Sequence, residues 1–120
     1  MSQTEDRNSD SNSLNPVASD VFTMPLDLEP AADVVSGHPR TATHELGTIG
    51  ETEVGIWELT EGVVRDTEVE EIFVVLSGSG QIDFEDGRTL LLQPGTAVRL
   101  HEGQRTTWTI TEALRKVYVA

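Results

Sequence analysis

Short apolar runs separated by polar turns dominate the chain from about residue 31 onward. β-branched and aromatic residues gather in these runs, and Gly, Asp-Gly or Pro-Gly follows most of them. This texture is typical of strands and hairpins rather than helices. No ten-residue stretch carries an apolar stripe at helical spacing, although one helical turn fits within 112–115. We expect strands at 41–46, 53–60, 70–76, 80–84, 89–92, 97–100, 106–111 and 114–119, with turns at 77–80, 85–87, 93–95 and 102–103.

Alternation within two of these strands indicates which side faces a core. Between residues 70 and 76, one face carries Glu71, Phe73 and Val75. The opposite face is also largely apolar, which predicts a central strand. In the strand at 106–111, the predicted inward face carries Thr106, Trp108 and Ile110. Several short strands at this spacing predict an all-β fold, an antiparallel sandwich or barrel.

The first 30 residues differ in composition from the rest. Residues 1 to about 20 are mostly Ser, Asn, Asp, Glu, Gln and Thr, so we expect them to be disordered. Residues 21–30 add scattered hydrophobes, with Pro25 and Pro30 blocking a continuous helix. We interpret them as an arm that lies across the domain or a partner subunit. The predicted organisation is a disordered acidic tail and arm over 1–30 and one barrel domain over 31–120.

Charge and composition narrow the possible partners. Acidic residues outnumber Lys and Arg by 21 to 8, for a formal net charge of −13, so nucleic acid and anionic membranes are not expected partners. The chain has no cysteine, which excludes disulfides and thiolate metal sites. Neither a signal peptide nor an apolar run of about 18 residues is present, and a cytoplasmic location is the expectation.

The segment between residues 71 and 103 resembles the two sequence motifs of the cupin superfamily. The first motif ends in Glu, six residues and Gly, and Glu71 is followed after six residues by Gly78. The second reads Gly, five residues, Pro, one residue, Gly, two residues and His. Here the corresponding residues are Gly95, His101, Gly103 and Thr106. The sequences at 55–58, 108 and 115–118 are similar to the small single-domain cupins named for ureidoglycine aminohydrolase.

The resemblance implies a double-stranded β-helix, or jelly-roll barrel, and a homodimer. In the family, two histidines ahead of the motif glutamate, that glutamate and the second-motif histidine hold a divalent metal. The first two positions here are Arg65 and Thr67, or Val64 and Asp66 with a spacing one residue longer, and Thr106 takes the fourth. Because these imidazoles are missing, we predict no cofactor, with a divalent metal such as Mn, Zn or Fe as the alternative.

Glu71 is the main candidate for a catalytic residue. A carboxylate turned into an apolar barrel suits a general acid or base, or an acceptor that orients a ligand. The alternative is a structural salt bridge with Arg65, Arg99 or Arg105. The other candidate ligand-binding residues are Trp108, Thr106, His101 and Trp57.

Each of these candidates also has a structural interpretation. Trp108 shares its face with Thr106 and suits stacking on a planar or sugar-like ligand, but core packing explains Trp108 and Trp57 equally well. His101 is either a proton-transfer group at the barrel mouth or an exposed turn residue. We expect the cluster Glu68, Glu70 and Glu71 to form a solvated acidic edge, and His38 and His44 to lie at the surface.

Three functions remain open from the sequence. The first is a cupin-domain protein that binds a small organic metabolite in the barrel, with the conventional metal site lost. The second is an enzyme of hydrolase, isomerase or lyase type that uses Glu71 as acid or base. The third is a non-catalytic structural or regulatory subunit that pairs as a dimer through exposed strand edges.

Overall fold

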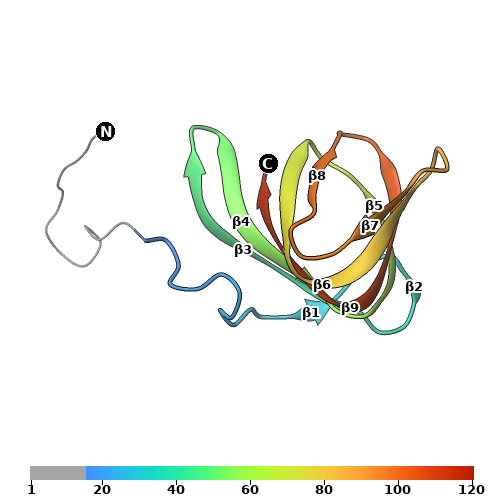
Figure 1. Ribbon diagram of the computed structural model, residues 1–120, viewed down its shortest axis with the longest axis horizontal. Helices are drawn as coiled ribbons and strands as arrows, with labels where there is room; N and C mark the ends of the chain where they lie inside the picture. The colour runs from blue at the N-terminus through green and yellow to red at the C-terminus, as the bar shows by residue number, and fades with distance from the viewer. Residues whose placement is uncertain (1–15) are drawn as a thin grey trace, which may run out of the picture.

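The computed structural model describes residues 16–120, which form an all-β fold (Figure 1). The all-β prediction is confirmed. Of the residues expected to be disordered, 1 to about 20, the first 15 lie outside the described part. The strands are β1 (Glu29–Pro30), β2 (Val34–Ser36), β3 (Arg40–Ile49), β4 (Thr52–Leu59), β5 (Gly62–Thr67), β6 (Glu71–Phe84), β7 (Thr89–Leu92), β8 (Ala97–Leu100) and β9 (Arg105–Val119).

Two long strands, β6 and β9, organise the sheet. β9 pairs with β4 through its C-terminal half and with β5 through its N-terminal half, while β6 runs antiparallel along its other edge. β6 in turn pairs with β7 and β8, and β3 continues the sheet beyond β4. Figure 1 shows the result, a strongly curled sheet with the β3–β4 hairpin on one side and β6, β7 and β8 on the other.

The predicted turn at 77–80 is wrong, because the chain continues through it as part of β6. The register between β6 and β9 shifts three times between Val75 and Gly80, so irregular pairing bends both strands without ending them. Gly78 has φ +90°, and a Cβ at this position would collide with the Ala113 carbonyl oxygen. Glycine is therefore required at 78 for a close backbone approach rather than for a hairpin.

The same bend accounts for two further differences from the prediction. The expected strands at 106–111 and 114–119 are halves of β9, and 112–115 forms no helical turn. Strand β5 was not predicted, since its apolar content is limited to Val63 and Val64.

The core fills the inside of the curled sheet. Phe73 and Val75 from β6 are each 1% exposed, as the alternation predicted. From β9, the predicted inward residues Thr106, Trp108 and Ile110 are also buried. The opposite face of β6 carries Ile72 and Val74, which are 47% and 36% exposed, so β6 has strands on both sides but only one buried face.

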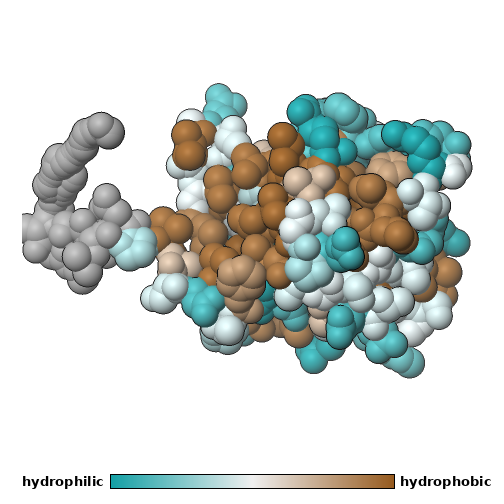
Figure 2. All heavy atoms as spheres, viewed as in Figure 1, coloured by the Kyte–Doolittle hydropathy of each residue, from teal (hydrophilic) through white to brown (hydrophobic). Residues whose placement is uncertain are grey.

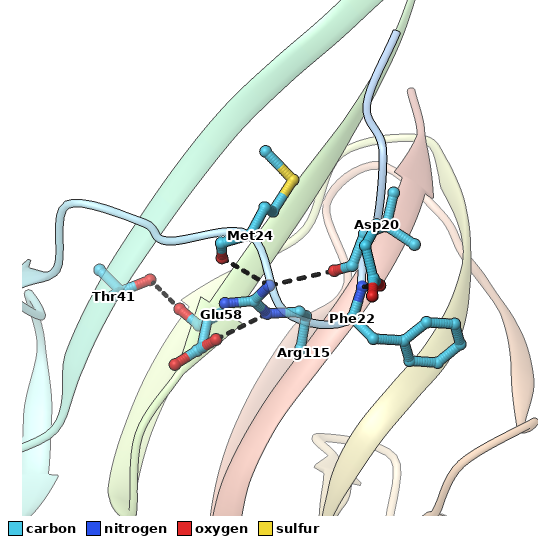
Figure 3. Close-up of polar contacts among 7 residues, drawn as sticks. Asp20, Phe22, Met24, Thr41, Glu58 and Arg115 are labelled. Carbon is cyan, nitrogen blue, oxygen red and sulfur yellow. Dashed lines mark hydrogen bonds and ion pairs between the residues drawn. The ribbon is translucent and has the colours of Figure 1, made fainter. Parts of the chain in front are cut away.

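Residues 21–28 lie against the outer face of the sheet. Arg115 of β9 donates from Nη1 to the carbonyl oxygens of Val21, at 3.0 Å, and Met24, at 2.8 Å (Figure 3). Its Nε donates to Glu58 Oε1 of β4 at 2.8 Å, and both side chains are largely buried. One guanidinium thus fixes the arm to two strands, since its planar fork presents several donors at once.

Apolar side chains gather on the face seen in Figure 2, over β4, the end of β9 and β6. The exposed members include Ile72, Val74 and Val119, and Ile72 pairs directly with Val119 across the sheet. We call these three residues the outer apolar face. Within residues 16–120, no helix has the length and apolar character needed to cross a bilayer.

Candidate functional site

A pocket of about 310 Å³ opens into the barrel beside β4, β6 and β9. Four carboxylate side chains and one ammonium group line it, together with two tryptophans and a tyrosine. The lining residues are Thr43, Glu53, Trp57, Asp66, Glu68, Val69, Glu71, Trp108, Lys116, Tyr118 and Ala120. The charges make the pocket acidic, as the whole chain is.

Lys116 is the central charged residue of this pocket. On β9 it pairs with Trp57 of β4 on one side and Val75 of β6 on the other, and alternation turns its side chain inward with Leu114 and Tyr118. The side chain is only 5% exposed, and Nζ lies 2.5 Å from Glu71 Oε2, whose own side chain is 10% exposed.

Aromatic rings surround the Lys116 ammonium on its other sides. Nζ lies 4.2 Å from the ring centre of Phe73, 4.5 Å from that of Trp57 and 5.0 Å from that of Trp108. A cation near aromatic faces is attracted by their quadrupoles, more strongly where water is excluded. Burial nevertheless lowers the pKa of Lys116, and the nearby Glu71 carboxylate opposes that shift.

Glu68 is a second buried carboxylate, 5% exposed, in the segment between β5 and β6. Its Oε2 accepts a hydrogen bond from Thr106 Oγ1 at 2.6 Å and another from Trp108 Nε1 at 3.0 Å. The backbone is fixed as well, because Glu68 N donates to Gln104 O and Gly103 N donates to Glu68 O. Glu68 thereby holds the Trp108 indole in place at the pocket wall.

Two further ionisable groups at the pocket have shifted pKa values. Burial, and secondly the Glu68 charge, raise the pKa of Asp66. Burial also raises the pKa of Tyr118, whose hydroxyl donates to Glu53 Oε2. Both shifts favour the neutral, protonated form. Asp66 is therefore a potential proton donor facing the pocket, whereas the Tyr118 proton is held by Glu53.

The structure brings three of the predicted site residues together. Glu71, Trp57 and Trp108 all line the pocket. Thr106 is buried behind it, hydrogen-bonded to Glu68. The salt bridge considered for Glu71 exists with a different partner, Lys116. The three arginines that were predicted as partners of Glu71 form salt bridges with other carboxylates: Arg65 with Asp33, Arg99 with Glu70 and Arg105 with Glu85.

His101 does not line the pocket, and its position agrees with the second of its two interpretations, an exposed turn residue. It lies exposed after β8, with Nδ1 3.5 Å from Glu70 Oε2. The predicted acidic edge is wrong for two of its three members. Only Glu70 is exposed there, because Glu68 and Glu71 turn inward.

Sequence reasoning missed Lys116 and Glu68. A signal for Lys116 was present: it is the single lysine of the chain, and it shares one face with Leu114 and Tyr118 in the strand predicted at 114–119. Glu68 gave no such signal, because it lies outside any strand and is buried only by the loop at 103–104 and by β9.

The residues present do not fit the transition metal that cupins commonly hold. The chain's three histidines, His38, His44 and His101, are all exposed. The motif glutamate, Glu71, accepts a hydrogen bond from the Lys116 ammonium. Thr106, at the position of the fourth ligand, donates a hydrogen bond to Glu68. In residues 16–120, no three His, Asp or Glu side chains are grouped as metal ligands.

A larger hollow of about 490 Å³ lies beside the C-terminal end of β5 and shares Asp66 with the first pocket. Its charged residues include the exposed ion pairs Arg65–Asp33 and Arg105–Glu85, each with a closest N–O distance of 3.7 Å. Exposed pairs of this kind are weak and mobile. The smaller pocket, with its buried charges and indole walls, is therefore the better candidate site.

Comparisons with solved structures support the fold. The EutQ protein of Clostridium difficile superposes with a TM-score of 0.59 at 24% identity, covering 68% of this chain and 67% of that one. A structure from Salmonella typhimurium LT2, assigned to ethanolamine utilization protein Q, gives 0.60 at 16% identity, covering 78% and 76%. A DUF861-family protein of unknown function from Pseudomonas syringae pv. tomato DC3000 gives 0.70 at 22% identity, covering 82% of this chain and 45% of that one.

At these identities the structural likeness shows the fold alone, and the chain spans less than half of the Pseudomonas protein. No curated protein matches the sequence. The family model described as the EutQ-like cupin domain matches residues 46–118, which is more than half of the chain and includes β4 to β8 and almost all of β9. The chain therefore belongs to the EutQ-like cupin family.

Proposed function

We propose that the barrel binds a small organic molecule, uncharged or cationic, and that the Lys116 ammonium takes the place that a metal ion holds in other cupins. One observation carries this proposal: Lys116 Nζ lies 2.5 Å from Glu71 Oε2, inside a ring of aromatic side chains. Glu71 is the residue that the cupin resemblance assigns to metal binding. An internal cation therefore neutralises it.

The size and charge of the pocket support this ligand class. A volume of about 310 Å³ is near the lower end of the range of roughly 300–1,000 Å³ for small-molecule sites. Four carboxylates against one ammonium give the pocket a negative potential, which attracts cations and repels anions. The indole of Trp57 is only partly buried and offers an apolar surface for the ligand.

Ligand-observed NMR with a panel of small amines, polyols, ureides and carboxylates tests the proposal. We expect binding among the first three groups and none among the carboxylates. Glu71→Gln should weaken that binding at least tenfold, because the amide leaves Lys116 without its counter-charge. Glu70→Gln is the matched control on the outer face and should leave binding unchanged. A preference for carboxylates, or equal binding by Glu71→Gln, would contradict the proposal.

A catalytic role in the same pocket is the second candidate. The 2.5 Å contact between Lys116 and Glu71 allows a proton to pass between amine and carboxylate, which suits acid–base chemistry of a hydrolase, isomerase or lyase. In this second proposal, the chain is a member of the ureidoglycine aminohydrolase-type subfamily of cupins. Metal analysis of protein purified without chelator is informative here. Stoichiometric Mn, Zn or Fe would show that Lys116 does not replace a metal.

Our third proposal is a homodimer that forms through the outer apolar face. In this proposal the protein is a structural or regulatory subunit in the cytoplasm. Ile72, Val74 and Val119 lie exposed on neighbouring strands, as a sheet-to-sheet interface requires. Ile72→Asp should convert the dimer to a monomer, measured as mass in solution by light scattering. Leu91→Asp on β7, where Leu91 is 70% exposed, is the control. A monomeric wild type would remove this proposal.

A further inference from the structure

The single lysine of the chain points into a pocket instead of toward solvent. Lysine side chains are among those least often buried, since the ammonium group loses its hydration. Here Lys116 lines a pocket of about 310 Å³, and its Nζ has a carboxylate acceptor at 2.5 Å. An amine in such a setting has the two features of a nucleophilic lysine, an apolar surround and a neighbouring base.

We propose that Lys116 captures an aldehyde or ketone as a reversible imine. This rests on the proposed function, and it names the ligand class as an uncharged carbonyl compound. A carbonyl group has no charge to be repelled by the four carboxylates of the pocket. The tryptophan rings offer apolar surface to the rest of such a molecule.

The reaction can be written with the groups present. Glu71 takes a proton from the Lys116 ammonium, which frees the nitrogen lone pair. Nζ then forms a bond to the carbonyl carbon while the carbon–oxygen π bond breaks, and a proton passes from the nitrogen to the oxygen. Glu71 returns its proton to the resulting hydroxyl group, which leaves as water, and the nitrogen lone pair forms the C=N double bond. The balance is one ammonium group and one carbonyl compound giving one protonated imine and one water, and no oxidant or reductant is consumed.

Two neighbouring groups support this chemistry. Asp66 faces the same pocket, and its raised pKa makes it a second proton donor for the departing hydroxyl. Glu68 is engaged by Thr106 and Trp108 and does not compete for the amine.

Reductive trapping with propanal and sodium cyanoborohydride at pH 7 tests the inference. Peptide mass mapping locates the propyl group, and the amino terminus of the chain serves as the internal standard. In the unfolded chain Lys116 has an ordinary pKa, so its neutral fraction is roughly several-hundred-fold smaller than that of an α-amine. We expect the ratio of Lys116 label to amino-terminal label to be at least tenfold higher in native protein than in urea.

The wild-type comparison needs no variant, so the test holds even if a substitution prevents folding. An equal or lower ratio in the native protein would overturn the inference. Lys116→Arg keeps the charge and should remove the internal label, whereas Glu70→Gln should retain it. If small amines or polyols bind in the NMR panel while Lys116 stays unlabelled, the inference fails and the proposed binding function stands. If nothing binds and nothing is labelled, both fail.

Discussion

Removal of the Lys116 ammonium should destabilise the fold by about 3 kcal/mol, at the lower end of the roughly 3–5 kcal/mol found when one member of a buried ion pair is lost. The side chains of Lys116 and Glu71 are 5% and 10% exposed, so water cannot replace the missing partner. In Lys116→Met, the Glu71 carboxylate stays buried near Asp66 and Glu68. Packing of the methionine sulfur against the aromatic rings offsets only about 0.3–1.5 kcal/mol per contact.

A double-mutant cycle separates the ion pair from simple packing. Glu71→Leu alone should cost a similar amount, because it strands the ammonium. The double variant Lys116→Met/Glu71→Leu should recover to within about 1 kcal/mol of wild type or exceed it, since hydrophobic replacement of a buried pair is often neutral or stabilising. The coupling energy should therefore be at least about 5 kcal/mol, well above the roughly 0.3–0.5 kcal/mol expected of independent sites.

Urea unfolding at fixed protein concentration provides the measurement. The only two tryptophans of the chain, Trp57 and Trp108, both line the pocket, so their fluorescence follows the barrel directly. Arg105→Met is the control, because the Arg105–Glu85 pair is 72% and 70% exposed and should contribute less than about 1 kcal/mol. A cost below about 1 kcal/mol for Lys116→Met, with an unchanged slope against urea and no coupling, would refute the reasoning.

Three other changes have definite expected outcomes. Relative to its effect on free tryptophan, cesium should quench the tryptophan fluorescence more than iodide does, and added salt should reduce this difference. A larger relative effect of iodide would show that the pocket is not acidic. Gly78→Ala should lower the thermal midpoint well beyond Gly87→Ala, because a Cβ meets backbone atoms at 78 and nothing within 4 Å at 87; equal shifts would contradict this. The Arg99 guanidinium and the Glu102 N–H lower the pKa of Glu70 from 4.5 to about 2, so its contribution to stability is present above pH 4.5 and is lost as pH falls toward 2. The difference in thermal midpoint between wild type and Glu70→Gln should shrink over that interval, and a constant difference would count against the pair.

Much of the fold was predictable because strand alternation is a local property. Phe73 and Val75 on one strand and Trp108 and Ile110 on another alternate with more polar or exposed positions, and that period of two sets which face is buried. Gly78 was correctly marked as special but wrongly interpreted as a turn. A sequence shows that glycine is needed, but not whether a hairpin or a neighbouring backbone requires it.

The pocket itself depended on contacts between strands far apart in the sequence. Glu71 could be nominated from its motif, but its partner could not, because Lys116 lies 45 residues away on β9. Only the register that sets Lys116 beside Trp57 and Val75 turns this side chain into the barrel. The sequence alone determined most of the strands, the acidic charge and the absence of histidine from the motif positions. The tertiary structure decided which cation neutralises Glu71, since that depends on the pairing of distant strands and on the exclusion of water between them.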